Sequence, residues 1–329
     1  GGEYLVIDVG QGSYARQTTM GLPVGQITGI LLTHFHSDHI TELGETCTMS
    51  WANSGRREPL PGYGPPGVKE VVAGFRQAYE QDSHYRVQHH GHLSPNNWRR
   101  HGAFPTAVEI PLPGGSNSSM DSTLVFERNG LKVYAFNVDH KPVVPAYGYR
   151  FEYNGRVVTV SGDCCKCPQL LKYSSGADIL VSEACSCHVV GIIGTNMKDQ
   201  LGGEQGSRIA GIMTDIQDYH LDVQDVVDIA AAAKTPVLAL THLVPGTRGS
   251  WFLKKLWMAR LRRPAGWAGK MYVGEDGDAF HLPAFSPAIE FVNVLTGRSD
   301  GWLTRSWSGR SIALLVVVMA LLQGWRSRL

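Results

Sequence analysis

Short apolar runs that lead into a His or an Asp recur along this 329-residue chain. Residues 30–33 (Ile-Leu-Leu-Thr) predict a buried strand, because a brief continuous apolar run is typical of a strand covered on both faces. Similar runs occupy residues 132–138, 156–162 and 236–241. In residues 220–233, by contrast, apolar side chains recur at helical spacing and predict a helix with one buried side. We therefore expect several strands that deliver polar groups at their ends.

The densest polar cluster is the hexad at residues 34–39 (His-Phe-His-Ser-Asp-His), directly after the first apolar run. His34 and His36 alternate, so both side chains can project from one side of an extended backbone. Asp38 and His39 follow where the chain turns away. Two ligand sets that face neighbouring points in space suit a pair of metal ions.

Three further candidate ligands, His140, Asp163 and His242, follow the other apolar runs. Each alone would be a weak signal, because a lone polar residue after a strand usually caps it. Together with the hexad they form a set of imidazoles and carboxylates that suits two Zn²⁺ ions, with Mn²⁺ or Fe as alternatives. The sequence contains neither a G-x-S-x-G nucleophile elbow nor a P-loop, and a metal pair requires neither.

These motifs make the chain resemble metallo-β-lactamase-fold hydrolases, most closely the branch of ribonuclease Z and its arylsulfatase-like and phosphodiesterase-like relatives. The matching segments are spread from residue 5 to residue 277, which is most of the chain: residues 5–10, 33–39, 63–67, 140, 161–163, 240–245 and 273–277. The resemblance implies an α/β fold, a four-layer αβ/βα sandwich with metals at the mouth between two sheets. Relatives carry a further strand pair upstream, so we expect N-terminal strands to be missing ahead of Gly1.

The resemblance also implies a role for each ligand. One zinc ion would have three His ligands, the second would have an Asp and two His, and one further Asp would bridge both. The implied sets are His34, His36 and His140 for the first ion, Asp38, His39 and His242 for the second, and Asp163 for the bridge.

The expected chemistry is hydrolysis by a metal-bridging water that Asp38 orients or deprotonates. In ribonuclease Z-like proteins, a Glu in a His-Glu-Ala-Thr segment pairs with a later His. Here residues 182–185 read Ser-Glu-Ala-Cys, which keeps Glu183, and His220 supplies the later imidazole. The pair is either a general acid for the leaving group or a fastener between helix and sheet. The apolar side of the predicted helix comprises Val223, Val226, Val227, Ile229 and Ala230.

Composition fits a globular enzyme: 43% of residues are hydrophobic, 18% are charged and the formal net charge is +1. Near-neutral charge gives no global attraction to nucleic acid. Because the candidate ligands span positions 34 to 242, we expect one hydrolase domain over residues 1–285. A linker over residues 286–310 and an apolar segment over residues 311–325 would follow. The expected partner is a small-molecule ester or a phosphodiester, and a homo-oligomer is compatible with the sequence.

Two C-terminal segments suggest contact with a membrane. Residues 311–325 carry no charge, but at 1.5 Å per residue they span only about 22 Å, less than the ~30 Å of a bilayer core. They predict either a membrane anchor or a helix docked on the protein. Residues 251–263 contain five basic residues, two Trp and no acid. They predict a membrane- or phosphate-binding surface, or a helix with one face in the core. Membrane-associated, cytoplasmic and periplasmic locations all remain open.

Two other clusters admit several interpretations. His84, His89, His90, His92 and His101 match no defined metal motif, so a solvated loop is expected, with substrate contact or an extra metal as alternatives. The six cysteines suit buried free thiols, a disulfide or a further metal site. They are Cys47, Cys164, Cys165, Cys167, Cys185 and Cys187.

The sequence leaves the substrate open among three hypotheses. The first is a phosphodiesterase, including a tRNA 3′ endonuclease like ribonuclease Z. Against the tRNA substrate, only 22 residues separate His140 from Asp163, which leaves no room there for the long tRNA-clamping arm of those enzymes. The second is a small-molecule hydrolase: an arylsulfatase, lactonase or β-lactamase. The third, a non-catalytic membrane-associated binding protein, is disfavoured because no ligand of the set is lost.

Overall fold

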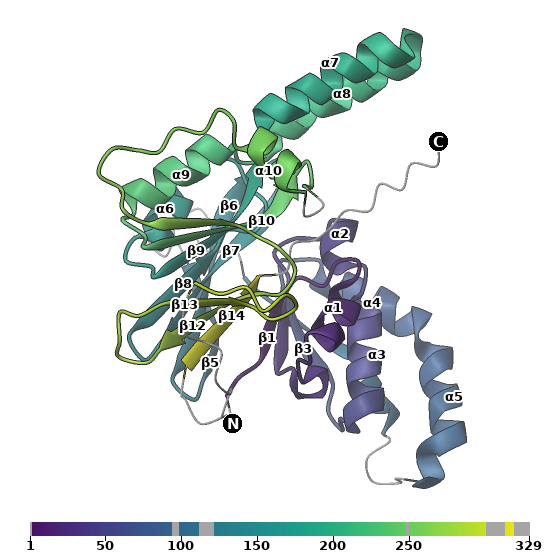
Figure 1. The fold of residues 1–329 in the computed structure, drawn as a ribbon. Coiled ribbons are helices and arrows are strands. Elements are labelled where there is room, and N and C mark those ends of the chain that lie inside the picture. Colours follow the sequence, from purple (N-terminus) through teal and green to yellow (C-terminus); the bar gives the residue numbers. More distant parts are fainter. Residues whose placement is uncertain (1, 94–98, 112–121, 248–249, 301–312, 319–329) are drawn as a thin grey trace. The chain divides into compact units, whose positions relative to one another are not determined.

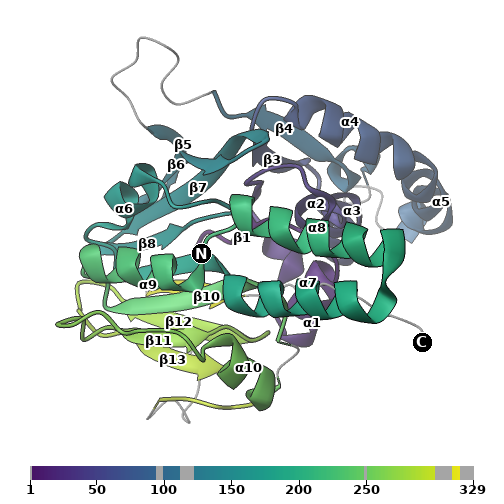
Figure 2. The same ribbon diagram turned by 90° about the horizontal axis from the view of Figure 1, so that it is seen from above.

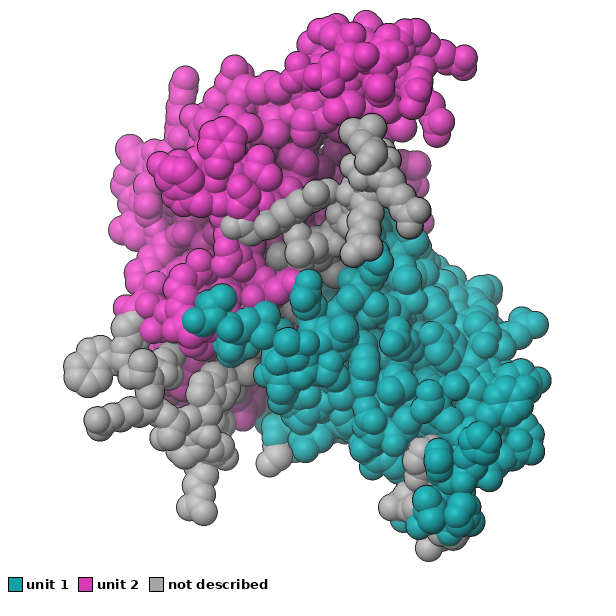
Figure 3. Space-filling view, turned by 45° about the vertical axis from the view of Figure 1, so that its right-hand side comes forward, with its two compact units in different colours: residues 1–135, 294–296 teal, residues 136–293, 297–329 magenta. Residues whose placement is uncertain are grey.

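A computed structural model describes residues 2–93, 99–111, 122–247, 250–300 and 313–318 (Figure 1). The chain divides into two compact units, coloured separately in Figure 3. Unit 1 comprises residues 1–135 and 294–296, and unit 2 comprises residues 136–293 and 297–329. The predicted domain limits, at residues 285 and 310, remain predictions.

Unit 1 is built on a parallel four-stranded sheet in the order β1-β2-β3-β4. Its strands are β1 (Leu5–Ile7), β2 (Gly29–Leu31), β3 (Leu60–Gly64) and β4 (Pro105–Glu109). The α-helices are α1 (Ser13–Thr19), α2 (Ser37–Ile40), α3 (Leu43–Ser54), α4 (Val68–Ala78) and α5 (Glu80–His90). Three 3₁₀ turns, η1 (Val24–Gln26), η2 (Gly91–Leu93) and η3 (Arg100–Ala103), connect them.

The predicted buried strand after position 29 is confirmed as β2, which lies between β1 and β3. Ile30, Leu31 and Leu32 are fully buried. Ile30 and Leu32 belong to a core cluster with Leu43 of α3 and Val68 of α4. Burial of each such side chain contributes about 1.5–3 kcal/mol, so the start of the hexad is held by a packed strand.

A mixed sheet has the strand order β11-β10-β9-β8-β7-β6-β5; strands β7 to β11 belong to unit 2, whereas β5 belongs to unit 1. The chain passes from unit 1 into unit 2 inside β6, after Ala135. Strands β8 to β11 run parallel, whereas β7 pairs antiparallel with β8. The strands are β5 (Ser122–Arg128), β6 (Leu131–His140), β7 (Val143–Tyr153), β8 (Arg156–Val160), β9 (Ile179–Cys185), β10 (Val237–Val244) and β11 (Lys270–Val273).

Helices α6 and α9 contribute to the main core of unit 2 (Figure 1). The predicted amphipathic helix is confirmed as α9 (Val223–Ala232), and all five residues of its predicted apolar side are buried. It begins after Asp222 because this side chain accepts a hydrogen bond from the Gln224 amide at 2.8 Å and caps the helix. The remaining helices are α6 (Pro168–Ser174), α7 (Cys187–Leu201), α8 (Gly203–Tyr219) and α10 (Trp251–Trp257).

Helices α7 and α8 form a long hairpin that projects from the rest of unit 2 (Figures 1 and 2). The chain reverses at Gly202 and Gly203, whose φ angles of 59° and 54° are ones that glycine adopts readily. The helices pack closely because Gly206 lies against the Lys198 backbone, where a Cβ atom would be only 2.9 Å from the carbonyl oxygen. In the sequence, the hairpin lies between β9 and α9.

A three-stranded sheet in the order β13-β12-β14 completes unit 2. Its strands are β12 (Asp278–Pro283), β13 (Glu290–Asn293) and β14 (Ala313–Val318). β13 falls within the expected linker, and β14 falls within the apolar segment, where it pairs antiparallel with β12. Residues 311–312 and 319–325 of that segment lie outside the described residues. No helix in the described part of the chain is long and apolar enough to span a bilayer.

One expectation about local structure is corrected. The predicted histidine-rich loop is helical: His84, His89 and His90 lie on α5, and all five histidines are exposed. They are absent from every metal-competent group found among the described residues. In the basic segment at residues 251–263, helix α10 begins at Trp251 and ends at Trp257, and turns follow it.

Candidate functional site

The hexad changes conformation midway, which separates its polar side chains into two pairs. His34 and His36 follow β2, and His36 is extended, with φ −61° and ψ 149°. Helix α2 begins at Ser37, so Asp38 and His39 lie in a helical turn. The predicted arrangement, an extended pair followed by a turn, is therefore present.

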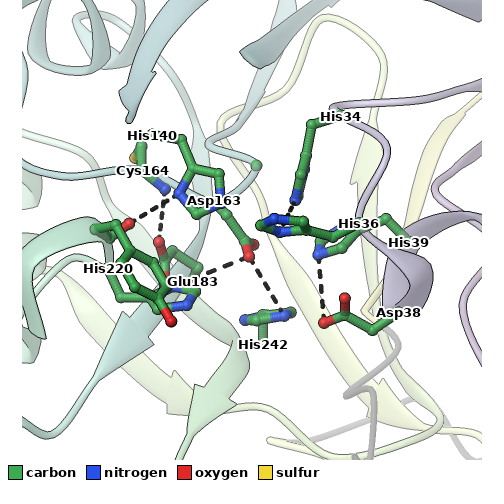
Figure 4. Close-up of polar contacts among 12 residues, drawn as sticks. His34, His36, Asp38, His39, His140, Asp163, Cys164, Glu183, His220 and His242 are labelled. Carbon is green, nitrogen blue, oxygen red and sulfur yellow. Dashed lines mark hydrogen bonds and ion pairs between the residues drawn. The ribbon is translucent and has the colours of Figure 1, made fainter. Parts of the chain in front are cut away.

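The three hexad imidazoles lie against one another within unit 1 (Figure 4). His34 Nε2 lies 2.9 Å from His36 Nδ1, and the ring centroids of His34 and His39 are 4.1 Å apart. His39 Nε2 lies 3.7 Å from the Asp38 carboxylate. His34 and His39 are buried. The hexad therefore brings two buried imidazoles and one exposed imidazole together in unit 1.

Asp8 orients this group, a role that the sequence analysis missed. Its carboxylate accepts hydrogen bonds from the Thr33 amide and hydroxyl, both at 2.8 Å, and from His39 Nδ1 at 2.7 Å. A carboxylate on one ring nitrogen fixes the tautomer and leaves the other nitrogen as a metal ligand. The signal was the one used for the candidate ligands, a polar residue directly after an apolar strand, because Asp8 directly follows strand β1.

Unit 2 contains a second group of candidate site residues, which lie in or next to the strands and helices of that unit. His140 is the last residue of β6, and its Nδ1 donates to the Tyr219 carbonyl at 2.9 Å. Asp163 follows β8, and Glu183 lies in β9. His220 lies between α8 and α9. Asp163, Glu183, His220 and His242 each offer a ligand atom within 4.8 Å of the other three.

His242 projects from a bulge rather than from a regular strand position. In the β9–β10 pairing, Thr241 is opposite Glu183 and Leu243 is opposite Ala184, so His242 is the extra residue. Its φ of 42° lies in the left-handed region, which is costly for a residue with a side chain. The bulge redirects the imidazole, and Nε2 lies 3.5 Å from Asp163 Oδ2.

Glu183 and His220 form the pair predicted from sequence. His220 Nδ1 donates to Glu183 Oε2 at 2.8 Å, and the Cys164 amide donates to Oε1 at 2.6 Å (Figure 4). Burial, followed by the nearby Asp163 charge, raises the pKa of Glu183 well above its usual range. His220 Nδ1 also lies 3.9 Å from Asp163. The pair can therefore hold a proton beside Asp163.

The six cysteines are free thiols. A hydrogen bond between Cys164 and Cys167, together with burial, raises the pKa of Cys164, and the same bond lowers the pKa of Cys167 to about 6. The neighbouring Cys187 side chain, followed by burial, raises the pKa of Cys185. No cysteine belongs to a metal-competent group among the described residues.

Both groups have the donor chemistry that a metal requires. Each combines imidazole nitrogens with carboxylate oxygens, the ligands that zinc prefers when thiolates are absent. In His39 and His140, Nδ1 is held by a neighbouring oxygen, so Nε2 is the nitrogen directed away from that contact. The residues of each unit therefore fit metal ligation.

Replacing Asp8 by Asn is expected to lower metal affinity by about 10–100-fold, the usual effect of losing a group that orients a ligand. The amide keeps the size of the side chain but removes its charge. Asn also tolerates the left-handed backbone, where φ is 55°. Competition with a chromogenic chelator measures the affinity, with Asp199→Asn on α7 as the control. Equal affinity for the Asp8 variant and the wild type would contradict this role.

Comparisons with known proteins agree with the geometry. The family model described as a beta-lactamase superfamily domain matches residues 5–243, which include every candidate ligand. A ribonuclease Z of Mycobacterium marinum is 32% identical over 247 residues, which cover 74% of this chain and 77% of the relative. A ribonuclease Z of Mycolicibacterium paratuberculosis is 30% identical over 278 residues, covering 84% and 87%.

A solved structure supports the fold. The metallo-β-lactamase fold protein YhfI from Bacillus subtilis superposes with a TM-score of 0.51 at 17% identity, covering 83% of this chain and 86% of its own. The fold class predicted from the sequence is therefore confirmed. The chain belongs to the metallo-β-lactamase superfamily and, within it, to the ribonuclease Z-like branch.

Proposed function

We propose that this chain is a dinuclear zinc-dependent phosphodiesterase. The observation that carries the proposal is the buried group of Asp163, Glu183, His220 and His242, which combines metal ligands with a proton-holding pair. Family membership supports the assignment, because curated relatives that align along most of their length bear the name ribonuclease Z.

The proposed ligands are those implied by the sequence. His34, His36 and His140 would hold one ion, Asp38, His39 and His242 the other, and Asp163 both. When bound, a zinc pair supplies a water that is deprotonated near neutral pH and an electrophile that polarises the phosphate.

The side chains of this chain would act on either side of the scissile bond. The Asp38 carboxylate would accept a hydrogen bond from the attacking water and so orient it. The Glu183–His220 pair would deliver a proton to the leaving oxygen, which a phosphodiester needs because an alkoxide is a poor leaving group. The 2.8 Å bond between the two side chains keeps the imidazole in one orientation.

Strands β7 and β8 occupy most of the chain between His140 and Asp163. This segment, all of which the structure describes, therefore contains no long tRNA-clamping arm, as the short spacing predicted. The projecting hairpin α7–α8 lies elsewhere in the chain. It carries two basic residues, Lys198 and Arg208, and four acidic ones, Asp199, Glu204, Asp215 and Asp218. An excess of acid does not suit phosphate binding. The charge of the hairpin therefore does not support a role in clamping RNA. The alternative substrates remain a small phosphodiester, a sulfate ester, a lactone or a β-lactam.

Metal analysis with a hydrolysis panel tests the proposal. We expect about two zinc ions per chain and turnover of bis-p-nitrophenyl phosphate in preference to p-nitrophenyl sulfate, nitrocefin and a lactone. Cleavage of pre-tRNA as well would narrow the substrate to that of ribonuclease Z. His36→Ala should lose metal and activity together, because His36 is a proposed ligand. His84→Ala on the exposed face of α5 is the matched control and should change neither.

The outcomes separate the candidates. Turnover of only the sulfate, lactone or β-lactam would assign the chain to small-molecule hydrolysis. Absence of bound metal and of turnover after reconstitution with zinc and manganese would overturn the proposal.

A further inference from the structure

An exposed aromatic and basic surface lies on α10 and the turn after it. We define the α10 surface as Trp251, Phe252, Lys255, Arg260 and Arg262. Trp251 is 68% exposed and Phe252 is 65% exposed, although both are large apolar rings. Exposed aromatic side chains that are adjacent in sequence and surrounded by cations are typical of binding surfaces rather than of a core.

The helix is firmly attached, so this exposure does not reflect a loose segment. Trp257 at the other end of α10 is buried in the unit 2 core. Its indole donates to the Val244 carbonyl at 3.3 Å, and the Ser186 hydroxyl donates to the Trp257 carbonyl at 3.0 Å. The core therefore takes up one side of α10 and leaves Trp251 and Phe252 directed to solvent.

The charge of the surface is one-sided. Residues 251–270 contain no Asp or Glu. Lys254 pairs with Glu275, and Lys270 pairs with Asp300. Lys255, Arg260 and Arg262 are exposed and form no salt bridge within the part of the chain that the structure describes. The Lys255 ammonium lies over the Trp251 ring, 4.0 Å from its centroid, which places a cation beside one face of the indole.

The α10 surface is connected to the candidate site through β10. Trp257 is anchored on Val244, two residues beyond the candidate ligand His242 on the same strand. Ser186, the other anchor, follows β9, which carries Glu183. The anchors of α10 therefore lie near the ends of the two strands that carry His242 and Glu183.

We propose that the α10 surface binds unpaired nucleotides of an RNA substrate. Bases would stack on Trp251 and Phe252, and Lys255, Arg260 and Arg262 would contact the phosphates, the combination typical of single-strand binding. This inference rests on the proposed phosphodiesterase function and assigns a surface of the chain to unpaired nucleotides of the substrate. A membrane surface fits less well, because α10 has only seven residues and its Trp257 side is already buried.

The test measures binding of a fluorescent oligouridine to the full chain by anisotropy, with gels to verify that the probe is intact. Trp251→Ala combined with Phe252→Ala should weaken binding by about tenfold or more, as expected for loss of stacking. Phe285→Ala, which removes another exposed ring of unit 2, is the matched control and should leave binding unchanged. Zinc content and turnover of bis-p-nitrophenyl phosphate should be unchanged in both variants.

A second pair of variants tests the charges. Arg260→Gln with Arg262→Gln should reduce the slope of log affinity against log salt by about 1.4, because two phosphate contacts are lost. Lys198→Gln with Arg208→Gln on the α7–α8 hairpin should leave the slope unchanged.

Two results would overturn the inference. One is unchanged oligouridine affinity in the aromatic variant. The other is a loss of binding to phosphatidylcholine–phosphatidylserine vesicles without loss of RNA binding, which would assign the surface to membranes. Loss of oligouridine binding in the aromatic variant would support the α10 surface even if the panel shows no phosphodiesterase activity, so the two proposals fail separately.

Discussion

Asp163→Asn is expected to lower kcat/KM for a phosphodiester by about 10³-fold or more and to release zinc. The Asp163 carboxylate lies 3.5 Å from His242 Nε2 and 3.9 Å from His220 Nδ1, in a buried position. The amide has the same shape but no charge to bind two cations, and metal catalysis contributes several kcal/mol, each 1.36 kcal/mol being tenfold in rate. Steady-state kinetics and elemental analysis of the same preparation measure both losses.

Asp215→Asn is the matched control, because Asp215 is exposed on α8. It should retain the zinc content and kcat/KM of the wild type. If Asp163→Asn kept both as well, Asp163 would have no place in the metal centre, and the proposed bridge would be excluded.

Glu183→Gln is expected to lower kcat by about 10²–10⁴-fold, the usual contribution of a general acid, and to leave the zinc content unchanged. Gln has the size of Glu and can still accept the Cys164 amide, so the fold around it is preserved. It cannot pass a proton to His220. Elemental analysis and pre-steady-state kinetics separate the two readouts.

The leaving group provides the internal control for the Glu183 variant. A p-nitrophenolate departs without a proton, so bis-p-nitrophenyl phosphate should lose much less rate than a diester with an alkoxide leaving group. Equal losses on both substrates would indicate that the pair only fastens α9 to β9. That fastening was the alternative that the sequence left open.

Strands that end in candidate ligands could be predicted because two signals coincide in them. A short apolar run must be buried, and a His or Asp directly after it needs a separate explanation. The same reasoning was successful for α9, where Val223, Val226 and Ile229 recur at helical spacing and are all buried.

Features set by contacts between distant segments could not be predicted. Asp8 orients His39 across 31 positions of sequence, and no local pattern records that contact. The bulge at His242 follows from its pairing with β9, which periodicity cannot show. The histidine-rich segment was wrongly expected to be a loop, because exposed helices such as α5 have too few apolar residues for a clear pattern.

The left-handed backbone at His242 has a consequence for engineering. A residue with a Cβ in that conformation costs the folded state of the order of 1–3 kcal/mol, whereas glycine would adopt it without strain. A procedure that ranks substitutions by backbone strain alone would therefore favour glycine at position 242. The resulting protein would be relieved of this strain and would lack a proposed metal ligand. At position 242, the backbone conformation that is unfavourable for folding is the one that presents the proposed ligand. Variants designed for stability should therefore be screened by activity as well as by melting temperature.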